Sequence, residues 1–309
     1  MPRSKLQVIV CSSFLAIVVS LSLCCPFIAC AQTDYYHKEF KWSYQGYEWT
    51  FNLDIPKSLY EMYQKVPVTT RLLHQSSGYG FLTTTNDPYL QKVASELKNA
   101  SSQKGYDSYD EVSLALAFIQ SLPYTSDSVT SKYDEYPRFP LETLVDNGGD
   151  CEDTSILFAT LTIIMGYGTV YINPQDHYAV GVLGDNLSGY HYTYNNKTYY
   201  YCETTGDGWE IGQVPDEHRN ADAYIFPINE NQQYDAFAHY SSALLTRPPT
   251  ATSLITTSPI PSPAVTSSPS AWPEGYLLLS METVYLIAVC VLLLIAVCAL
   301  VVVLRKRPA

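Results

Sequence analysis

Cys151 occupies a position where a reactive thiolate is expected, at the start of a buried helix. Two glycines before Asp150 predict a tight turn, and Asp150 with Asp153 three residues later has the spacing of a capping box. From Thr154 to Met165 the sequence is apolar on almost every side, which predicts a central, buried helix. Unpaired backbone N–H groups and the helix dipole at such a terminus stabilise a thiolate. This thiolate could serve as a nucleophile or as a metal ligand.

Two residues further along the chain could complete a nucleophilic site around this cysteine. His177 begins one strand pattern, and Glu203 ends another that starts at Tyr199. In a cysteine–histidine site the imidazole removes the thiol proton, and a carboxylate orients the imidazole and stabilises its charged form. Taken alone, a strand histidine is more often a core or rim residue, and a carboxylate at a strand end is usually a solvated charge. The chemistry is therefore indicated by the three residues together.

The combined motifs resemble the transglutaminase-like cysteine protease superfamily. The matching stretches are Gly-Gly-Asp-Cys-Glu-Asp, Asp-His-Tyr-Ala-Val and Glu-Thr-Thr-Gly with a tryptophan after it, preceded by a Tyr-Pro-Arg-Phe-Pro lead-in, all within residues 110–215. The resemblance implies a papain-like α+β fold, with Cys151 as nucleophile, His177 as general base and Glu203 as the orienting acid. Most members of the family place aspartate at the third position, so Glu203 is a departure from the pattern.

Two other uses of Cys151 have to be weighed. Of eight cysteines, only Cys151 and Cys202 lie between the two apolar ends of the chain, and two cysteines outside the cell are ordinarily paired. Adjacent strand residues point to opposite faces, however, so Cys202 faces away if Glu203 faces the site. A zinc site built from Cys151, His177 and Glu203, with His191 as a fourth ligand, lacks CxxC or HExxH spacing. We therefore expect no metal and no cofactor.

The oxyanion formed during acyl transfer needs hydrogen-bond donors. Gln120 on the preceding helix could supply one, as a glutamine does in papain-like enzymes, or it could be an ordinary solvated helix residue. The backbone N–H of Cys151 is the other expected donor.

The first 31 residues predict export from the cytoplasm. A basic start and an apolar run are followed by Ala29-Cys30-Ala31, which is typical of a signal peptide cleaved before Gln32. A lipoprotein anchored at Cys30 is the alternative.

The C-terminal part predicts a single membrane anchor. Residues 284–304 carry no charge and are long enough to span a bilayer, and the basic tail 305–309 should stay in the cytoplasm. The Pro-, Ser- and Thr-rich segment 247–283 predicts a stalk. We expect a single-pass protein of the cell membrane with its N-terminal ectodomain outside.

Periodicity between these ends predicts an α+β fold. Alternating aromatic residues from Lys38 to Leu53 around Gly46 predict a β-hairpin. Helices are expected at 57–65, 88–99 and 108–122, with one turn at 140–144 and the buried helix at 151–165. Strands are expected at 169–172, 177–183, 190–194, 198–202 and 223–228, joined as an antiparallel meander. We expect an N-terminal aromatic-rich extension over 32–105 and a catalytic domain over 106–246.

These features favour an enzyme that acts on amide bonds of a protein or peptide substrate through a thioester at Cys151. With water as acceptor it is a peptidase or amidase, which we expect because water is in excess unless a site excludes it. With an amine it is a cross-linking transglutaminase, and a non-catalytic surface binding or assembly module on the same fold is a further alternative. The formal net charge of −12, or −17 for residues 32–283, repels phosphate backbones and disfavours nucleic-acid binding.

The predicted topology can be tested on intact cells that make the full chain. Protease should cut the segment 247–283 and release a soluble fragment that contains Cys151, as detected by immunoblotting of the supernatant. Protection of that fragment until the cells are lysed would show that the orientation is wrong.

Overall fold

The computed structural model describes residues 34–219, 221–229, 231, 233–235 and 254–256. The chain divides into a unit Met1–Ile260, which holds all of these residues, and a unit Pro261–Ala309, which lies outside them. The predicted signal peptide, membrane helix and cytoplasmic tail also lie outside the described residues. Among the described residues, no helix is long and apolar enough to cross a bilayer.

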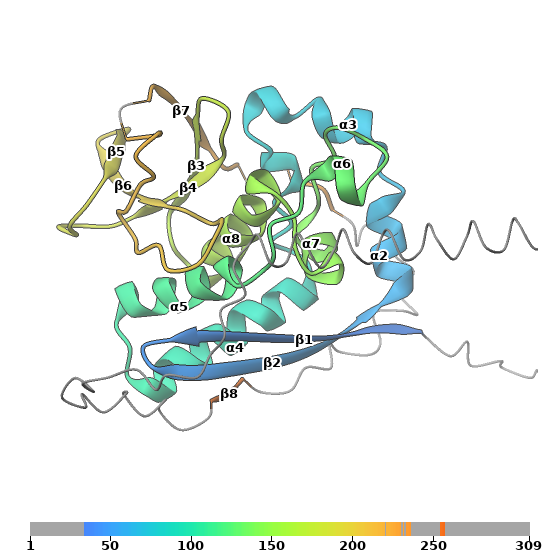
Figure 1. Cartoon of the computed structure of the whole chain (residues 1–309), viewed down its shortest axis with the longest axis horizontal. Helices are drawn as coiled ribbons and strands as arrows, with labels where there is room; N and C mark the ends of the chain where they lie inside the picture. The colour runs from blue at the N-terminus through green and yellow to red at the C-terminus, as the bar shows by residue number, and fades with distance from the viewer. Residues whose placement is uncertain (1–33, 220, 230, 232, 236–253, 257–309) are drawn as a thin grey trace, which may run out of the picture. The chain divides into compact units, whose positions relative to one another are not determined.

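The described chain begins with the β-hairpin that the alternating aromatic residues predict. Strand β1 (Tyr35–Tyr44) pairs antiparallel with β2 (Tyr47–Pro56) (Figure 1). Gln45 and Gly46 form the turn with φ values of 48° and 75°, the two-residue geometry that matches strand twist. The prediction of a hairpin over this stretch is confirmed.

A short third strand extends this hairpin sheet. Of the predicted stalk 247–283, the structure describes residues 254–256, and strand β8 (Ile255–Thr256) pairs antiparallel with β2 at Thr50 and Trp49. This part of the segment therefore packs against the folded unit.

The described helices are α2 (Lys57–Gln64), α3 (Val68–Leu72), α4 (Pro88–Lys104), α5 (Ser108–Gln120), α6 (Asp127–Thr130), α7 (Pro140–Asp146) and α8 (Cys151–Met165), with two 3₁₀ turns at Gln75–Ser77 and Gly80–Leu82. The helices α2, α4, α5, α7 and α8 lie at predicted positions, whereas α3, α6 and the two 3₁₀ turns were not predicted. Asp87 caps α4 by accepting from the N–H groups of its first turn, and Asp107 caps α5 in the same way. The sequence signals for these helix starts are therefore borne out.

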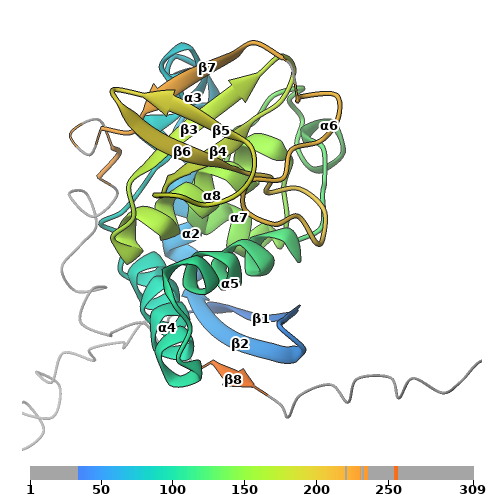
Figure 2. The same cartoon turned by 90° about the vertical axis from the view of Figure 1, so that its left-hand side faces the viewer.

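Helix α8 forms the centre of the fold, as its apolar sequence predicts. It packs against α4, α5 and α7 and against strands β3 (Thr169–Pro174) and β4 (Ala179–Leu183). Figures 1 and 2 show α8 lying between the larger sheet and the pair α4 and α5. The side chains from Ile156 to Ala159 are fully buried, and one core cluster joins them to the hairpin aromatics.

The larger sheet is antiparallel, but its strand order differs from the predicted meander. The order is β5 (His191–Tyr194), β6 (Lys197–Cys202), β4, β3 and β7 (Ala223–Pro227), so β6 and not β5 pairs with β4. The reason is burial: β6 carries a buried aromatic run, whereas His191 and Thr193 of β5 are exposed and suit an edge strand. This order brings the end of β6 next to the start of β4.

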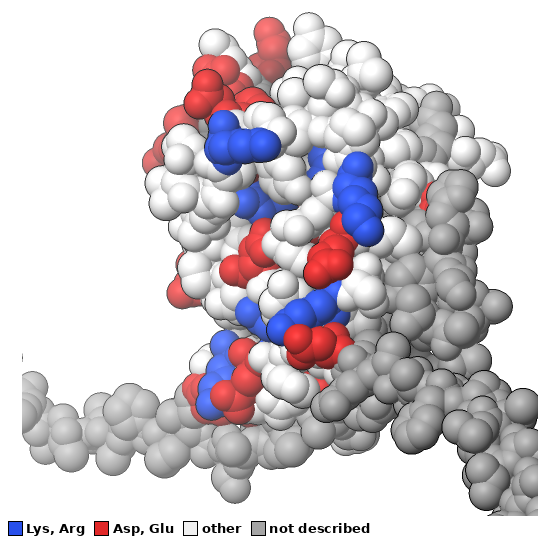
Figure 3. Space-filling view, turned by 90° about the vertical axis from the view of Figure 1, so that its right-hand side faces the viewer, with Lys and Arg blue, Asp and Glu red and all other residues white. Residues whose placement is uncertain are grey.

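The face of the molecule drawn in Figure 3 has Lys and Arg side chains lying beside Asp and Glu side chains. Although the whole chain has a net negative charge, side chains of both signs lie on this face. Exposed ion pairs such as Lys57–Asp34, at 2.6 Å, contribute little to stability.

The packing of the hairpin on α5 predicts a large loss of stability when Phe118 is truncated. Its ring centroid lies 5.4 Å from that of Phe40 and 4.9 Å from that of Trp42. Phe118→Ala should lower the free energy of unfolding by about 3–5 kcal/mol because it leaves a cavity in the shared core. Denaturant unfolding followed by tryptophan fluorescence measures this loss, and Val129→Ala, at an 80% exposed position, should change it by less than about 0.5 kcal/mol. A loss for Phe118→Ala no larger than that of this control would contradict the shared core.

Candidate active site

Cys151 is the first residue of α8 and follows a turn that requires glycine. Gly148 has φ of 148°, and a Cβ at this position would lie 2.4 Å from the carbonyl oxygen of Pro123. The N–H of Asp150 donates to the Asp153 carboxylate at 3.4 Å, in the capping arrangement that the spacing predicts. The half-buried thiol is therefore held at a helix N-terminus.

The electrostatic surroundings of this thiol differ from the prediction. Burial and the neighbouring carboxylates of Glu152 and Asp150 raise the pKa of the Cys151 thiol, and the backbone N–H of Tyr178 only partly opposes them. The thiol donates to Glu152 Oε2 at 3.3 Å. Burial and nearby acids also raise the pKa of Asp150 to about 8 and that of Glu152 to about 7. The described state thus holds a protonated thiol, in contrast to the expected thiolate.

A disulfide between the two cysteines of the described chain is not formed. Cys151 and Cys202 are both free, and Cys202 is buried in the core cluster. The inference that Cys202 faces away from the site agrees with this burial.

His177 is positioned by a turn and not by a strand. It was expected to begin a strand, but β4 starts two residues later, because Asp176 has φ of 56°, which an extended strand cannot accommodate. The His177 N–H donates to the carbonyl oxygen of Pro174 at 3.3 Å, and the Asn173 side chain donates to the His177 carbonyl at 2.7 Å. These bonds fix the backbone that carries the imidazole.

The structure brings His177 and Glu203 into contact. Nε2 of His177 lies 2.9 Å from Oε2 of Glu203, whose side chain is 1% exposed. The pairing of β4 with β6 explains this, because the register Val180–Cys202 places the residues before β4 beside those after β6. The extra methylene of glutamate, compared with the usual aspartate, therefore still allows a hydrogen bond.

The Glu203 carboxylate is held in one orientation by further donors. Its Oε2 also accepts from the Tyr201 hydroxyl at 3.0 Å, and its Oε1 accepts from the Thr205 N–H at 3.0 Å and hydroxyl at 2.6 Å. Burial alone would raise the pKa of Glu203, but His177 and Thr205 outweigh it and hold that pKa below its usual value. Glu203 is therefore ionised at neutral pH and fixed against the imidazole.

Hydroxyl groups near the start of α8 form hydrogen bonds with the segment before β4 and the segment after β6. Ser155 Oγ donates to the carbonyl oxygen of Tyr178 at 3.1 Å and lies 3.0 Å from Thr204 Oγ1, which is also 3.0 Å from Thr154 Oγ1. Tyr178 follows His177, and Thr204 follows the carboxylate, so these bonds set the helix relative to both. The sequence interpretation missed them, although hydroxyls inside a buried helix are a signal that partners exist.

Gln120 has a role that neither expectation described. It is buried, its Nε2 donates to the carbonyl oxygens of Glu203 at 2.8 Å and Trp209 at 3.0 Å, and its Oε1 accepts from the Gly208 N–H at 3.2 Å. Both the donor and the acceptor of its amide are thus engaged in hydrogen bonds that hold the loop after β6. The predictions of a solvated residue and of an oxyanion donor are both wrong for this arrangement.

Cys151, His177 and Glu203 line one cavity of about 640 Å³, together with Trp209 and the loop from Val214 to Arg219. From this loop His218, which the sequence interpretation missed, stacks on His177 with ring centroids 4.6 Å apart and ring planes 4° apart. Burial, followed by the charge of His177, lowers the pKa of His218. The structure therefore places a second imidazole against the predicted base.

Carboxylates beside the site have the oxygen chemistry that Ca²⁺ or Mg²⁺ prefers. The groups close enough to share a cation are Asp127, Asp150 and Asp153, and Asp127, Glu135 and Glu152. Arg138 already neutralises part of this cluster by donating to Asp127 at 2.7 Å and to Asp153, while Asp150 Oδ1 has no hydrogen-bond partner among the described residues. His191, weighed above as a zinc ligand, is exposed on β5 with Nδ1 at 3.1 Å from the Gly189 carbonyl oxygen, and it belongs to neither group.

Together the described elements define an α+β protein with a free cysteine at a buried helix terminus and a histidine–carboxylate pair on the sheet. No family model and no curated protein matches the sequence. Solved structures similar to this chain include Legionella pneumophila LapG in an EGTA-treated form, at 17% identity and a TM-score of 0.30, covering 55% of this chain and 80% of that one. A second Legionella pneumophila LapG structure is 16% identical with a TM-score of 0.28, covering 56% of this chain and 84% of that one. The likeness to LapG is distant. Scores of this size say nothing about activity, which is inferred below from the geometry.

The carboxylate beside the thiol predicts a measurable effect of Glu152→Gln. Removing this charge should lower the thiol pKa and raise the thiolate fraction at a fixed pH. Iodoacetamide labelling of Cys151 at pH 8 should therefore be faster, on the order of tenfold for each pKa unit removed, and the pH profile should move to lower pH. Glu217→Gln, whose carboxyl lines the same cavity, is the control and should leave the rate nearly unchanged. Slower labelling of Glu152→Gln would contradict the account.

Proposed function

We propose that this chain is a cysteine enzyme that cleaves amide bonds of proteins or peptides, with Cys151 as nucleophile, His177 as base and Glu203 as the group that orients the base. The observation that carries the proposal is the 2.9 Å contact between His177 Nε2 and Glu203 Oε2 in the cavity that Cys151 also lines. An ionised carboxylate that orients an imidazole, in a cavity that a free thiol also lines, is the set of groups that cysteine acyl transfer needs.

The hydrogen bond to Glu203 decides which imidazole nitrogen does the chemistry. An ionised carboxylate only accepts hydrogen bonds, so Nε2 of His177 carries a proton and Nδ1 of the neutral ring keeps its lone pair. Nδ1 is therefore the atom that takes the Cys151 proton. The carboxylate stabilises the imidazolium that results.

The reaction then follows in two balanced steps. The Cys151 proton moves to His177 Nδ1 while sulfur bonds to the substrate carbonyl carbon, and the imidazolium returns this proton to the departing amine as the C–N bond breaks. Water then attacks the thioester carbon and gives one proton to the His177 imidazole. The C–S bond breaks, the imidazolium returns this proton to sulfur, and the carboxylic acid product leaves. Because the resting thiol is protonated and donates to Glu152, proton removal accompanies attack and does not precede it.

The oxyanion of each step requires donors near the thiol. With the Gln120 amide occupied by Glu203, Gly208 and Trp209, the backbone N–H of Cys151 at the start of α8 is the donor we assign to this role. Hydrolysis is favoured over transamidation because water is in excess unless a site excludes it. We further propose that this activity lies outside the cell, on a chain anchored by residues 284–304.

Substitutions in the full chain should separate the three roles. Cys151→Ala should abolish cleavage of casein, and His177→Ala should abolish turnover and also slow thiol labelling. Glu203→Gln should retain part of the activity, with a loss on the order of ten- to ten-thousand-fold, and Glu203→Asp should be more active than Glu203→Gln.

Thermal melts of each variant check that it folds, and a glutamine peptide with a fluorescent amine tests for transamidation in the same preparation. Full activity of Glu203→Ala beside an inactive His177→Ala would exclude Glu203 as the third member, and Asp207 or Glu210 would then be the next candidates. Ordinary, slow labelling of wild-type Cys151 with no turnover on either substrate would favour the non-catalytic binding module.

A further inference from the structure

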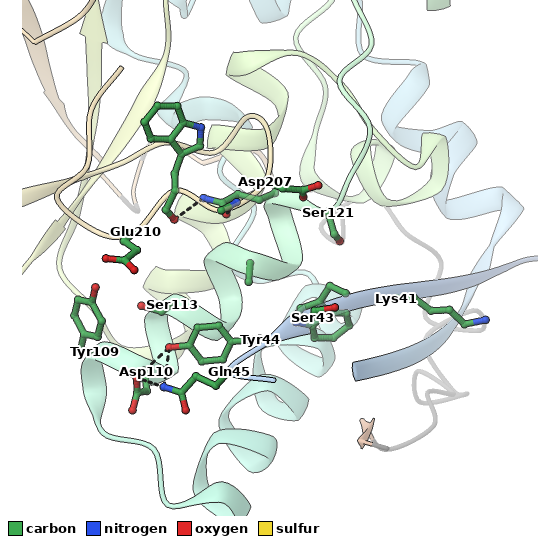
Figure 4. A pocket seen from close by; sticks show the side chains of 15 residues that line it. Lys41, Ser43, Tyr44, Gln45, Tyr109, Asp110, Ser113, Ser121, Asp207 and Glu210 are labelled. Carbon is green, nitrogen blue, oxygen red and sulfur yellow. Dashed lines mark hydrogen bonds between the residues drawn. The ribbon is translucent and has the colours of Figure 1, made fainter. Parts of the chain in front are cut away.

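A second cavity, of about 790 Å³, is drawn in Figure 4. Its walls are the end of β1, the helix α5 and the loop from Asp207 to Glu210. Trp209 lines both cavities. The two cavities therefore share a wall.

Acidic groups dominate the chemistry of this second cavity. Asp110, Asp207 and Glu210 line it, while its one cation is Lys41, which in Figure 4 lies apart from Glu210 and Asp110. Within the described part of the chain, Asp207 and Glu210 form no ion pair. Asp110 accepts from Gln45 at 2.7 Å, which fixes its carboxylate at the cavity edge. The cavity therefore offers negative charge that the described protein does not neutralise.

Aromatic rings stand beside these carboxylates. Tyr44 and Tyr109 line the cavity, and in Figure 4 the Tyr109 hydroxyl lies beneath the Glu210 carboxylate. Burial and the nearby Glu210 raise the pKa of Tyr109, so its phenol stays neutral. Trp42 also lines the cavity, is 4% exposed, and has an indole N–H without a hydrogen-bond partner among the described residues. Aromatic faces together with carboxylates are the surroundings that organic cations prefer.

The loop that forms the shared wall is held in place. The bonds from Gln120 to the backbone of Gly208 and Trp209 tie it to α5, the helix that lines the opposite side of the cavity. The carboxylates of Asp207 and Glu210 are thereby presented from a fixed backbone, while both side chains remain exposed to solvent. A prepositioned site loses less entropy on binding.

We propose that this cavity binds a lysine or arginine side chain of the same peptide whose amide bond reaches Cys151. This assignment rests on the proposed function, because it names the class of substrate for that site. The cavity that Cys151 lines is also rich in acidic side chains, since Asp176 and Glu217 line it. Its Arg219 is paired with Asp216 at 3.0 Å. The enzyme therefore selects basic segments of proteins.

Binding to the purified full chain with Cys151→Ala tests this without requiring turnover. The probes are three fluorescent decapeptides of the same Gly/Ala/Gln sequence that carry two arginines, two citrullines or two glutamates. Fluorescence anisotropy should show the arginine peptide binding about tenfold more tightly than the citrulline peptide, which has the same shape without the charge. The glutamate peptide should bind most weakly.

Substitution separates the cavity from the overall charge of the chain. Asp207→Asn with Glu210→Gln should remove most of the preference for arginine over citrulline. Glu61→Gln with Asp134→Asn changes the net charge equally at exposed positions outside the cavity and should keep the preference.

Equal affinity of the arginine and citrulline peptides, including no binding by either, would overturn the inference, as would equal losses in the two double variants. These outcomes are independent of catalysis. If the wild-type chain shows no reactive Cys151 but the arginine preference is intact, the proposed function is overturned and a binding site for basic segments is left.

Discussion

The geometry of the whole site depends on the hydrogen bonds that join the first turn of α8 to the ends of β4 and β6. Ser155 binds the backbone beside His177, and Ser155 and Thr154 both meet Thr204, beside Glu203. These groups are buried, so losing one partner would leave another unsatisfied at a cost of about 1–3 kcal/mol. A helix that carries a thiol and a sheet that carries an imidazole are in this way fixed relative to one another.

The same region concentrates carboxyl groups, which disfavour a thiolate. Glu152 accepts the hydrogen bond from the thiol. Asp150 and Asp153 lie in the same region, and Arg138 donates to Asp153. The helix terminus therefore lowers the pKa of the thiol, whereas the carboxylates raise it. Burial and the carboxylates prevail and raise the pKa of the Cys151 thiol.

Much of this fold could be predicted from local sequence signals. The hairpin, the capped helix starts and the apolar α8 follow from alternation, capping residues and hydrophobic pattern, each of which acts within a few residues. Contacts between distant segments could not be obtained in this way. The pairing of β6 with β4 depends on which strand buries more surface, and the position of Gln120 depends on a loop 83 residues or more further along the chain. His218 reaches His177 from another loop, and no spacing in the sequence indicates that stack.

The site residues illustrate the same limit. The sequence pattern drew attention to Cys151, His177 and Glu203, and the structure places His177 on Glu203 and all three around one cavity. It could not show that the thiol would donate to Glu152 and have a raised pKa, because that shift comes from burial and from several carboxylates at once. The electrostatic surroundings of the Cys151 thiol are thus a property of the folded site and not of the motif.

The central claim is that Cys151 carries the acyl group during turnover. Acid quenching of the full chain during turnover of a peptide thioester, followed by mass spectrometry of its proteolytic fragments, tests this most directly. The account predicts the acyl mass on the fragment that contains Cys151 and none on the fragment that contains the buried Cys202. Product formation with no acyl group on Cys151, or with the acyl group on another residue, would contradict it.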